Sequence, residues 1–378
     1  MLLNAHDFRA RARRRLPRGV FEYIDRGTED ERALGNLRSA LDAITLEPRV
    51  LNGPGIVPLA TQLFGRKVAA PLVIAPTAMA GLVCYDGEAR LARAAARVGV
   101  PFCVATQSIT PIETIREAAP DADLWFQLYL WRDRGLASAL LARAAACGCR
   151  TLVVTVDNQV APNREYNERN GFGVPVRPTV RNALDVACHP GWALGVLARY
   201  ILAGGMPTYA HYPPAFRSAI TRPALAEAVR IEPALSFADI AWIRENWPGR
   251  VVLKGVLSVA DARRCMDAGV EAIVVSAHGG RNLDVAPTPA SCLAGIAASA
   301  EGRMNVLADS GVRRGTDVLK YLALGAEAVM LGRLPLYGLA AGGEAGAEAV
   351  LRMIMREMEI ALGYLGASAL RDLTIAPD

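Results

Sequence analysis

The sequence predicts an α/β fold in which eight parallel strands, each followed by a helix, close into a (β/α)8 TIM barrel. Three observations predict it: short apolar runs recur, alanine- and leucine-rich helical segments separate them, and a polar residue ends each run. Continuous apolar runs are typical of parallel strands that helices cover on both faces. The runs span residues 70–77, 101–106, 124–129, 151–157, 250–256, 271–278, 305–311 and 327–333.

A doubly wound open sheet is the alternative arrangement of the same elements. Such a sheet is expected to show a G-x-G-x-x-G phosphate fingerprint after its first strand. The segment "APTAMAGL" (75–82) follows the first run and does not match that fingerprint. The barrel is therefore the favoured prediction.

Taken in order, the elements predict one domain over residues 1–378, with the barrel at about 66–362. About 65 residues precede the barrel, begin with helical spacing and are expected to form a helical cap over one barrel end. A long loop, about 164–235, separates the fourth and fifth strands, and such loops are usually lids or mobile segments. The segment 345–366 reads as an amphipathic helix that packs on the barrel.

Composition argues against several classes of protein. The net charge of +5 is mild, and the densest basic cluster (9–18) has the spacing of a solvated helix face, so no nucleic-acid partner is expected. The seven cysteines are scattered without zinc or disulfide spacing, which favours free thiols in a reducing cytoplasm and no metal site. The longest apolar stretch, Trp192–Met206, is too short to span a membrane and contains Arg199.

Every predicted strand ends in a residue that can bind a ligand or take part in chemistry. These residues are Thr77, Thr106, Gln127 with Tyr129, Asp157, Lys254, His278, Asp309 and Arg333. Because the carboxyl ends of barrel strands meet at one mouth, we expect these side chains to surround one active site.

Two strand ends carry the strongest chemical signals. Lys254 lies inside the apolar run "VVLKGV", where a cation is costly unless it is paired or faces an electron-rich group. His278 is followed by two glycines and by Arg281, a side chain suited to binding a carboxylate. A base beside a carboxylate clamp predicts proton abstraction next to a carboxylate, with Asp157 orienting the imidazole.

The last two strands predict a phosphate site. "LADSGVRRG" and "VMLGR" provide Gly311, Arg313, Gly332 and Arg333 at the corner where barrels usually bind phosphate. The phosphate belongs either to a cofactor or to a phosphorylated substrate.

Taken together, these motifs resemble the FMN-dependent α-hydroxy-acid dehydrogenases and oxidases, a family that includes L-lactate dehydrogenase, (S)-mandelate dehydrogenase and glycolate oxidase. The resemblance covers nearly the whole chain. Its segments are "FEYIDRGTEDE", "APTAM", "WFQLYLWRDR", "TVDNQVAPNRE", "LKGV", "SAHGGRNLD", "DSGVRRGTDVLKYLALGAEAVMLGR" and "YGLAAGGEAG". The resemblance implies FMN as cofactor, oxidation of an (S)-2-hydroxy acid or a related α-hydroxy compound to the 2-keto product, and a homotetramer.

The resemblance also implies a role for each site residue. The flavin is expected to contact Pro76, Thr77, Ala78, Thr106, Gln127, Thr155 and Lys254, and its phosphate to contact Asp309, Gly311, Arg313, Gly332 and Arg333. Tyr23, Tyr129, Arg164 and Arg281 are expected to bind the substrate, with His278 as the base and Asp157 behind it.

Three departures from the family pattern are visible. Ala277 replaces the asparagine that usually precedes the histidine, and "PNRE" (162–165) keeps Arg164 but lacks the arginine before it. Ser108 stands where glycolate oxidase has a bulky aromatic residue near the second strand end, which suggests a roomier pocket and a substrate larger than glycolate.

The segment "ACHPGWALGVLARYILAGGMP" in the long loop is similar to the "HPxWAW" segment of bacterial L-lactate dehydrogenases. By this resemblance, residues 185–214 are mobile and make peripheral contact with the inner face of the cell membrane, and the electron acceptor is a quinone or O2. A lid that packs its own apolar residues is the equally weighted alternative.

Other functions remain open at this point. One is an FMN oxidase that uses O2 on a substrate of specialised metabolism. Another is a non-redox barrel isomerase or lyase that acts on a phosphorylated substrate. The third is a non-catalytic flavin-binding relative, which Ala277 alone favours.

Overall fold

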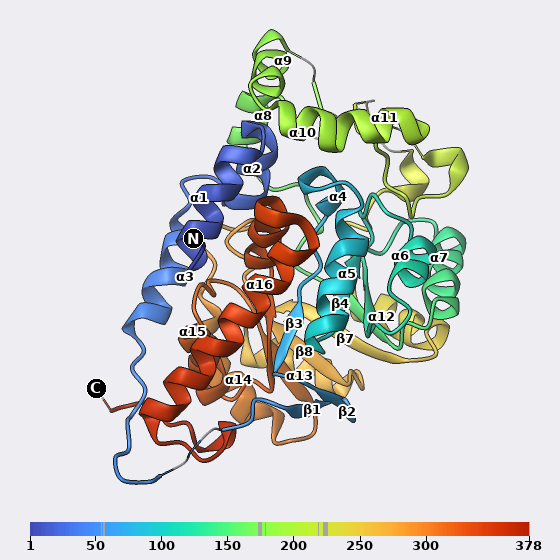
Figure 1. The fold of residues 1–378 in the computed structure, drawn as a ribbon. Coiled ribbons are helices and arrows are strands. Elements are labelled where there is room, and N and C mark those ends of the chain that lie inside the picture. Colours follow the sequence, from blue (N-terminus) through green and yellow to red (C-terminus); the bar gives the residue numbers. More distant parts are fainter. Residues whose placement is uncertain are drawn as a thin grey trace.

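The structure is a computed structural model that describes residues 1–53, 55, 57–172, 176–177, 179–217, 219–221 and 226–377. Eight parallel strands form a closed barrel in the order β10-β3-β4-β5-β6-β7-β8-β9, so the predicted TIM barrel is confirmed (Figure 1). All eight apolar runs contain their strand. The strands are β3 (Leu72–Ile74), β4 (Phe102–Ala105), β5 (Leu124–Leu128), β6 (Thr151–Thr155), β7 (Arg250–Val256), β8 (Ala272–Val275), β9 (Asn305–Ala308) and β10 (Ala328–Leu331).

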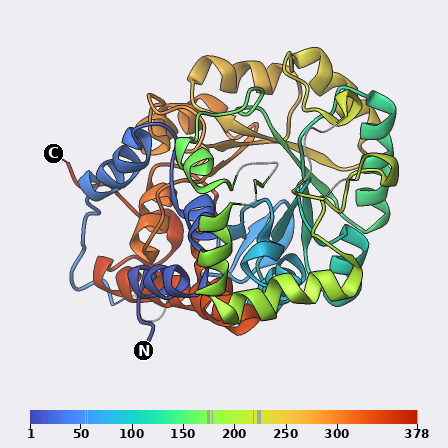
Figure 2. The ribbon, with the colours of Figure 1, turned by 90° about the horizontal axis from the view of Figure 1, so that it is seen from above.

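Helices surround the barrel, as Figure 2 shows from above. The helices of this ring are α5 (Gly87–Val98), α6 (Ile112–Ala118), α7 (Arg134–Ala146), α12 (Phe237–Asn246), α13 (Val259–Asp267), α14 (Pro289–Ala300), α15 (Gly315–Ala323) and α16 (Arg333–Leu365). Side-chain caps begin several of them, for example Asp133 at α7 and Ser258 at α13. The predicted amphipathic segment forms the second part of α16, after a kink at Gly342 and Gly343.

The residues before β3 cover one end of the barrel and part of its helix ring. The hairpin of β1 (Thr61–Leu63) and β2 (Arg66–Val68) packs Leu63 and Val68 against the inward-facing residues of the barrel strands. Helices α1 (Ala5–Arg15), α2 (Arg18–Asp25) and α3 (Arg32–Ala43) lie along the other side, where α1 packs on α16. In this arrangement the C-terminal end of α2 lies beside the carboxyl ends of the barrel strands.

The long connection that the sequence predicted after β6 is present, and it folds largely into short helices, which the sequence did not predict. These are α8 (Glu165–Asn170), α9 (Val180–Ala187), α10 (Pro190–Trp192), the π-helical turn η1 (Ala193–Leu197), α11 (Ala198–Gly204), and the 3-10 turns η2 (Pro214–Phe216) and η3 (Glu227–Val229). The apolar residues of the segment "ACHPGWALGVLARYILAGGMP" recur at helical spacing. Those on one side of α10–α11 pack against the rest of the protein.

Two side chains fasten these helices to the barrel. The indole Nε1 of Trp192 donates to the carbonyl of Leu82 at 2.6 Å, and the amide of Asp86 donates to the Tyr200 hydroxyl at 3.2 Å. Leu82 lies in the short helix α4 (Ala80–Val83), and Asp86 follows that helix. In the described part of the chain no single helix has the length and apolarity of a membrane span, although α9 and α10–α11, bent by 87°, pass that test as a pair.

Candidate active site

A cavity of about 190 Å³ opens at the carboxyl ends of the barrel strands. Sixteen of the predicted site residues line it: Tyr23, Pro76, Thr77, Ala78, Gln127, Tyr129, Thr155, Arg164, Lys254, His278, Arg281, Asp309, Gly311, Arg313, Gly332 and Arg333. The remaining two, Thr106 and Asp157, are not part of the lining but hydrogen-bond to residues that are. The structure therefore brings together side chains that are up to 310 residues apart, counted from Tyr23 to Arg333.

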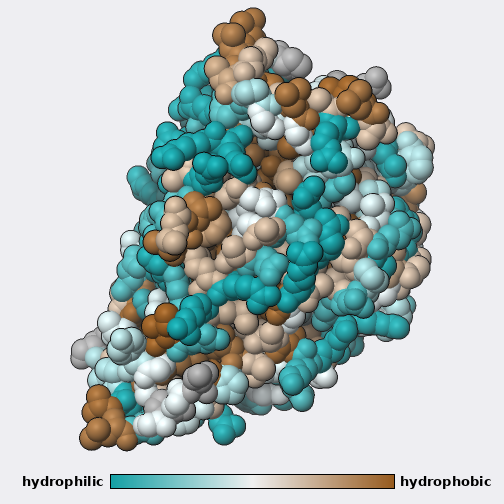
Figure 3. All heavy atoms as spheres, viewed as in Figure 1, coloured by the Kyte–Doolittle hydropathy of each residue, from teal (hydrophilic) through white to brown (hydrophobic). Residues whose placement is uncertain are grey.

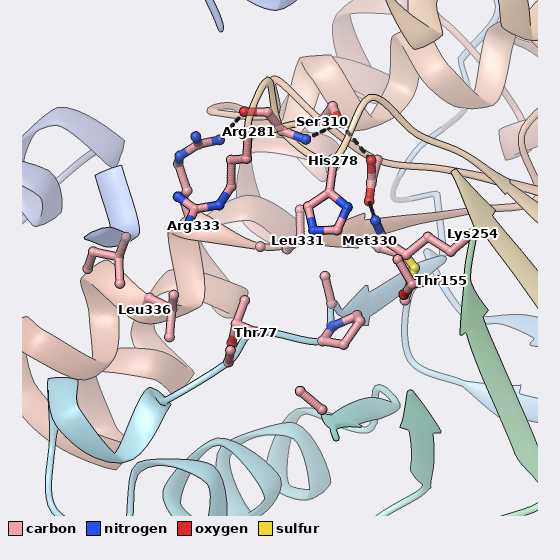
Figure 4. A pocket seen from close by; sticks show the side chains of 18 of the residues that line it. Thr77, Thr155, Lys254, His278, Arg281, Ser310, Met330, Leu331, Arg333 and Leu336 are labelled. Atoms are coloured by element: carbon pink, nitrogen blue, oxygen red, sulfur yellow. Dashed lines mark hydrogen bonds and ion pairs between the residues drawn. The ribbon is translucent and has the colours of Figure 1, made fainter. Parts of the chain in front are cut away.

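His278 follows β8 in the left-handed conformation (φ 52°), and Figure 4 shows its ring directed into the cavity. Its Nδ1 atom lies 2.9 Å from Oδ1 of Asp157, which follows β6. Burial lowers the pKa of His278 below its ordinary value, although Asp157 opposes the shift. Burial raises the pKa of Asp157, whereas His278 and Lys254 lower it. The lowering effects together are larger, so the pKa of Asp157 lies below its ordinary value. The pair thus combines a neutral imidazole with an ionised carboxylate.

Lys254 belongs to a network that joins three strand ends. Its Nζ atom donates to Ser276 Oγ at 2.9 Å and lies 3.0 Å from Asp309 Oδ2. The same Ser276 hydroxyl accepts the backbone amide of His278 at 3.0 Å. Burial lowers the pKa of Lys254, but Asp309 and Asp157 raise it above its ordinary value. The lysine is therefore a permanent cation that is held in place and only 4% exposed.

Two arginines and two tyrosines line the cavity near His278. Arg281 donates to the carbonyls of Tyr23 (2.6 Å) and Arg26, and its guanidinium lies 5.1 Å from the centre of the Tyr23 ring. Arg164 donates to the carbonyl of Arg281, and burial together with Arg281 lowers the pKa of Arg164 to about 10. Burial raises the pKa of Tyr129, so its hydroxyl keeps its proton. Two cations and a phenolic donor are thus available to a bound anion.

The predicted phosphate corner is formed by the starts of α15 and α16. Arg333 begins α16 and donates to the carbonyls of Asp25, Arg26 and Gly279, and the last of these bonds is drawn in Figure 4. Burial lowers the pKa of Arg333 to about 10. A Cβ added to the preceding Gly332 would meet open space. Free space beside Gly332 and two arginines, Arg313 and Arg333, at one corner suit a phosphate group.

Between the phosphate corner and His278, the cavity wall is made of hydrogen-bonding groups. Gln127 accepts from the Thr106 amide and donates to Thr155 Oγ1, so this row is fixed in position. The hydroxyl of Thr77, by contrast, is buried and has no hydrogen-bond partner in the described part of the protein. Buried polar atoms normally have partners, so Thr77 indicates that a polar ligand completes this wall.

The prediction that Ser108 borders the pocket is wrong. Ser108 is fully buried, is absent from the cavity lining and turns back toward β4 through a bond from its amide to the Ala105 carbonyl. Gln107 faces the cavity instead, and among the residues that the structure describes its side-chain amide reaches only the Tyr212 hydroxyl, at 3.5 Å. The strand-end pattern did not show which of two adjacent loop residues points inward.

Other residues of the lining were not predicted. They include Ile24, Asn158, Pro162, Ser310, Val312, Leu334 and Leu336. Asn158, Pro162 and Ser310 lie inside motifs that the sequence analysis quoted, and this position was the available signal. Ala277 lies outside the lining and is 6% exposed. Among the described residues, no three His, Cys, Asp or Glu side chains are placed to hold a metal ion.

Comparison with known proteins gives one consistent result. Residues 12–376 match the model of a family described as FMN-dependent dehydrogenase. The chain is 40% identical over 377 residues to an L-lactate dehydrogenase of Pectobacterium atrosepticum, covering 99% of this chain and 96% of that protein. It is 41% identical over 372 residues to an L-lactate dehydrogenase of Xanthomonas campestris, covering 98% and 95%.

Solved structures agree with the sequence relatives. An (S)-mandelate dehydrogenase described as a monotopic membrane protein superposes with a TM-score of 0.93 at 35% identity over the full length of both chains. A mandelate oxidase superposes with a TM-score of 0.84 at 32% identity, covering 100% of this chain and 99% of the other. The protein belongs to the FMN-dependent dehydrogenase family.

Proposed function

We propose that the protein oxidises an (S)-2-hydroxy acid to the 2-keto acid, with residues 1–378 acting as one domain. The observation that carries this proposal is the pairing of His278 with Asp157 in a cavity that also holds Arg281 and Arg164. The relatives named L-lactate dehydrogenase and (S)-mandelate dehydrogenase act on acids of this class, which supports the assignment.

The cavity residues fit FMN, the cofactor of the family. Arg313, Gly332 and Arg333 would hold the phosphate, together with Asp309 and Gly311 near the start of α15. The unpartnered Thr77 hydroxyl, together with Pro76, Ala78, Gln127, Thr155 and Lys254, would hold the ring system, with Thr106 fixing Gln127 from behind. Bound FMN supplies the two-electron oxidation.

The chain's own residues position the substrate and move one proton. Arg281 and Arg164 would bind the carboxylate, while Tyr23 and Tyr129 would contact the carboxylate or hydroxyl. His278, neutral because its pKa is lowered, would accept a proton from the substrate. Asp157 would stabilise the imidazolium that results. Lys254 would stabilise negative charge on the ring system of bound FMN.

Anaerobic mixing of the purified protein with a panel of 2-hydroxy acids tests this function. At least one (S)-2-hydroxy acid is expected to bleach the flavin absorbance, and its (R) enantiomer is not. Reoxidation of the reduced protein by O2 or by a quinone then distinguishes an oxidase from a dehydrogenase. A flavin that no 2-hydroxy acid bleaches would contradict the proposal. The non-redox isomerase and the non-catalytic relative would both give that result.

We also propose a peripheral membrane contact through residues 185–214 and the neighbouring helix α9. Large apolar side chains are exposed here: Val180 (79%), Leu184 (63%), Leu194 (70%), Ile201 (50%) and Leu202 (87%). Figure 3 shows hydrophobic atoms at the top of the molecule, over α9 and α11. A neighbouring (S)-mandelate dehydrogenase is described as a monotopic membrane protein, which supports a membrane contact of this kind. The proposed location is the inner face of the cell membrane, and the proposed electron acceptor is a quinone or O2.

Co-sedimentation with anionic lipid vesicles tests this contact. The pair Leu194→Ser and Leu202→Ser is expected to reduce binding, while the same change at exposed Leu283, elsewhere on the chain, serves as the control. An intact protein that never sediments with vesicles would contradict the membrane contact and leave the segment as a lid.

We also propose that the protein is a homotetramer. Its mass in solution checks this proposal.

A further inference from the structure

A second hollow, a groove of about 1090 Å³, adjoins the phosphate corner. It runs between α1 and α2 on one side and α3 and α15 on the other, and its lining includes Arg13, Arg38, Arg313 and Lys320. Gly311 and Arg313 line both the groove and the active-site cavity. The groove therefore adjoins the cavity at the end where a phosphate would lie.

The charge of this groove is positive. Its lining contains eight Arg and Lys side chains against five Asp and Glu, which leaves three positive charges in excess. All five carboxylates already pair with arginines of the groove, for example Asp25 with Arg9 at 2.6 Å and Asp317 with Arg38 at 2.7 Å. In the portion of the chain that the structure describes, Arg13 and Arg313 make no ion pair. Their charges are therefore available to an incoming anion.

On another side of the cavity, the connection after β6 is attached to the segments that follow β3 and β4. Trp192 and Tyr200 fasten α10 and α11 to the segments around α4, and the amide of Ala210 donates to the Ser108 carbonyl at 2.9 Å. These contacts hold the connection after β6 against the ends of β3 and β4.

We propose that the groove between α1 and α15 is the loading path for the cofactor, in which Arg13 steers the phosphomonoester of FMN toward Arg313. This inference rests on the proposed placement of the phosphate. A field of one sign lining a cleft raises association rates by about 10- to 1000-fold, and it does so without changing contacts in the final complex. Arg13 therefore acts on the association rate, whereas Arg313 and Arg333 act on affinity.

The test measures FMN binding to flavin-free protein by quenching of flavin fluorescence after rapid mixing. Arg13→Glu is compared with Arg11→Glu, which makes the same charge change on the same helix, at an exposed position that does not line the groove. At low salt, Arg13→Glu is expected to lower the association rate constant about fivefold or more, with the dissociation rate unchanged. In about 1 M salt, where the Debye length is about 3 Å, the difference should vanish.

Riboflavin provides a second arm, because it lacks the phosphate and its association should not respond to Arg13. Arg13→Gln, which removes only one charge, should give an intermediate rate and guards against a folding defect. Equal association rates for the Arg13 and Arg11 variants, or the same slowing with riboflavin, would overturn the loading path. If the unaltered protein did not bind FMN, the proposed phosphate site itself would be wrong.

Discussion

The Oδ1 atom of Asp157 lies 2.9 Å from Nδ1 of His278, although 121 residues separate them in the sequence. The contact joins the ends of β6 and β8 across the intervening strand β7 and leaves the histidine ring directed into the cavity. This relationship fixes the orientation of the proposed base and its charge state, and several expected results depend on it.

The pH dependence of the reaction should reflect the lowered pKa of His278. Because the folded-state pKa lies below the ordinary value of 6.5, the neutral base persists as the pH falls below 6.5. The acid-side midpoint of kcat/KM is therefore expected below pH 6.5. The folded protein also binds fewer protons here than the unfolded chain, so this group's contribution to stability is lost as the pH falls below 6.5.

Asp157→Asn supplies the matching variant for the pH profile. The carboxylate raises the pKa of the histidine, so its removal should move the acid-side midpoint to a still lower pH and slow flavin reduction. A midpoint above pH 6.5 in the unaltered protein, or a shift upward in the variant, would contradict the assigned pair.

Arg333→Ala should weaken FMN binding about 10- to 100-fold, because a charge-assisted contact to the phosphate is lost. Flavin retention after dialysis measures this. Arg15→Ala is the control, since Arg15 also donates to backbone carbonyls, those of Ala340 and Ala341, but does not line the cavity. Equal flavin retention in both variants would exclude Arg333 from the phosphate site.

Arg281→Lys keeps the positive charge but loses the planar fork that binds a carboxylate through two bonds. The KM for the 2-hydroxy acid should rise about tenfold, which corresponds to roughly 1.4 kcal/mol. Flavin content should stay unchanged because the phosphate corner lies at other strand ends. Steady-state kinetics provide the check, and a variant that loses flavin with an unaltered KM would argue for a cofactor role instead.

Gln107→Leu should change substrate preference. The amide of Gln107 faces the cavity and has only the 3.5 Å contact with Tyr212, so it can bind a polar group on the substrate. The ratio of kcat/KM for L-glycerate to that for L-lactate is expected to fall about fivefold or more, the effect of one hydrogen bond. Ser108→Ala is the control, because Ser108 lies outside the lining, and an equal fall in that variant would refute a role for Gln107.

Most of the barrel and the cavity were predictable because strand and site signals are local. A continuous apolar run marks each buried strand, and the polar residue after it marks the mouth, as for Lys254 and His278. Gln107 was missed because a shift of one residue in a loop reverses the direction of a side chain. The basic groove was missed because Arg13 and Arg313 are 300 residues apart in the sequence and line one groove only in the folded chain.

The helices after β6 were also not predicted as helices. Each is short, and their stability comes from tertiary anchors such as Trp192 on Leu82. The bond between Trp192 and Leu82 joins residues 110 positions apart. A contact of this kind leaves no periodic pattern of apolar residues in the sequence from which a helix could be predicted.

Flavin reduction in the variant His278→Gln tests the central claim most directly. Glutamine fills a similar polar site, and the phosphate contacts lie elsewhere, so the variant should fold and retain FMN. Rapid anaerobic mixing with a 2-hydroxy acid that the unaltered protein oxidises should then show flavin reduction slowed by about 10²- to 10⁴-fold. A variant that retains its flavin and reduces it at nearly the unaltered rate would contradict His278 as the base.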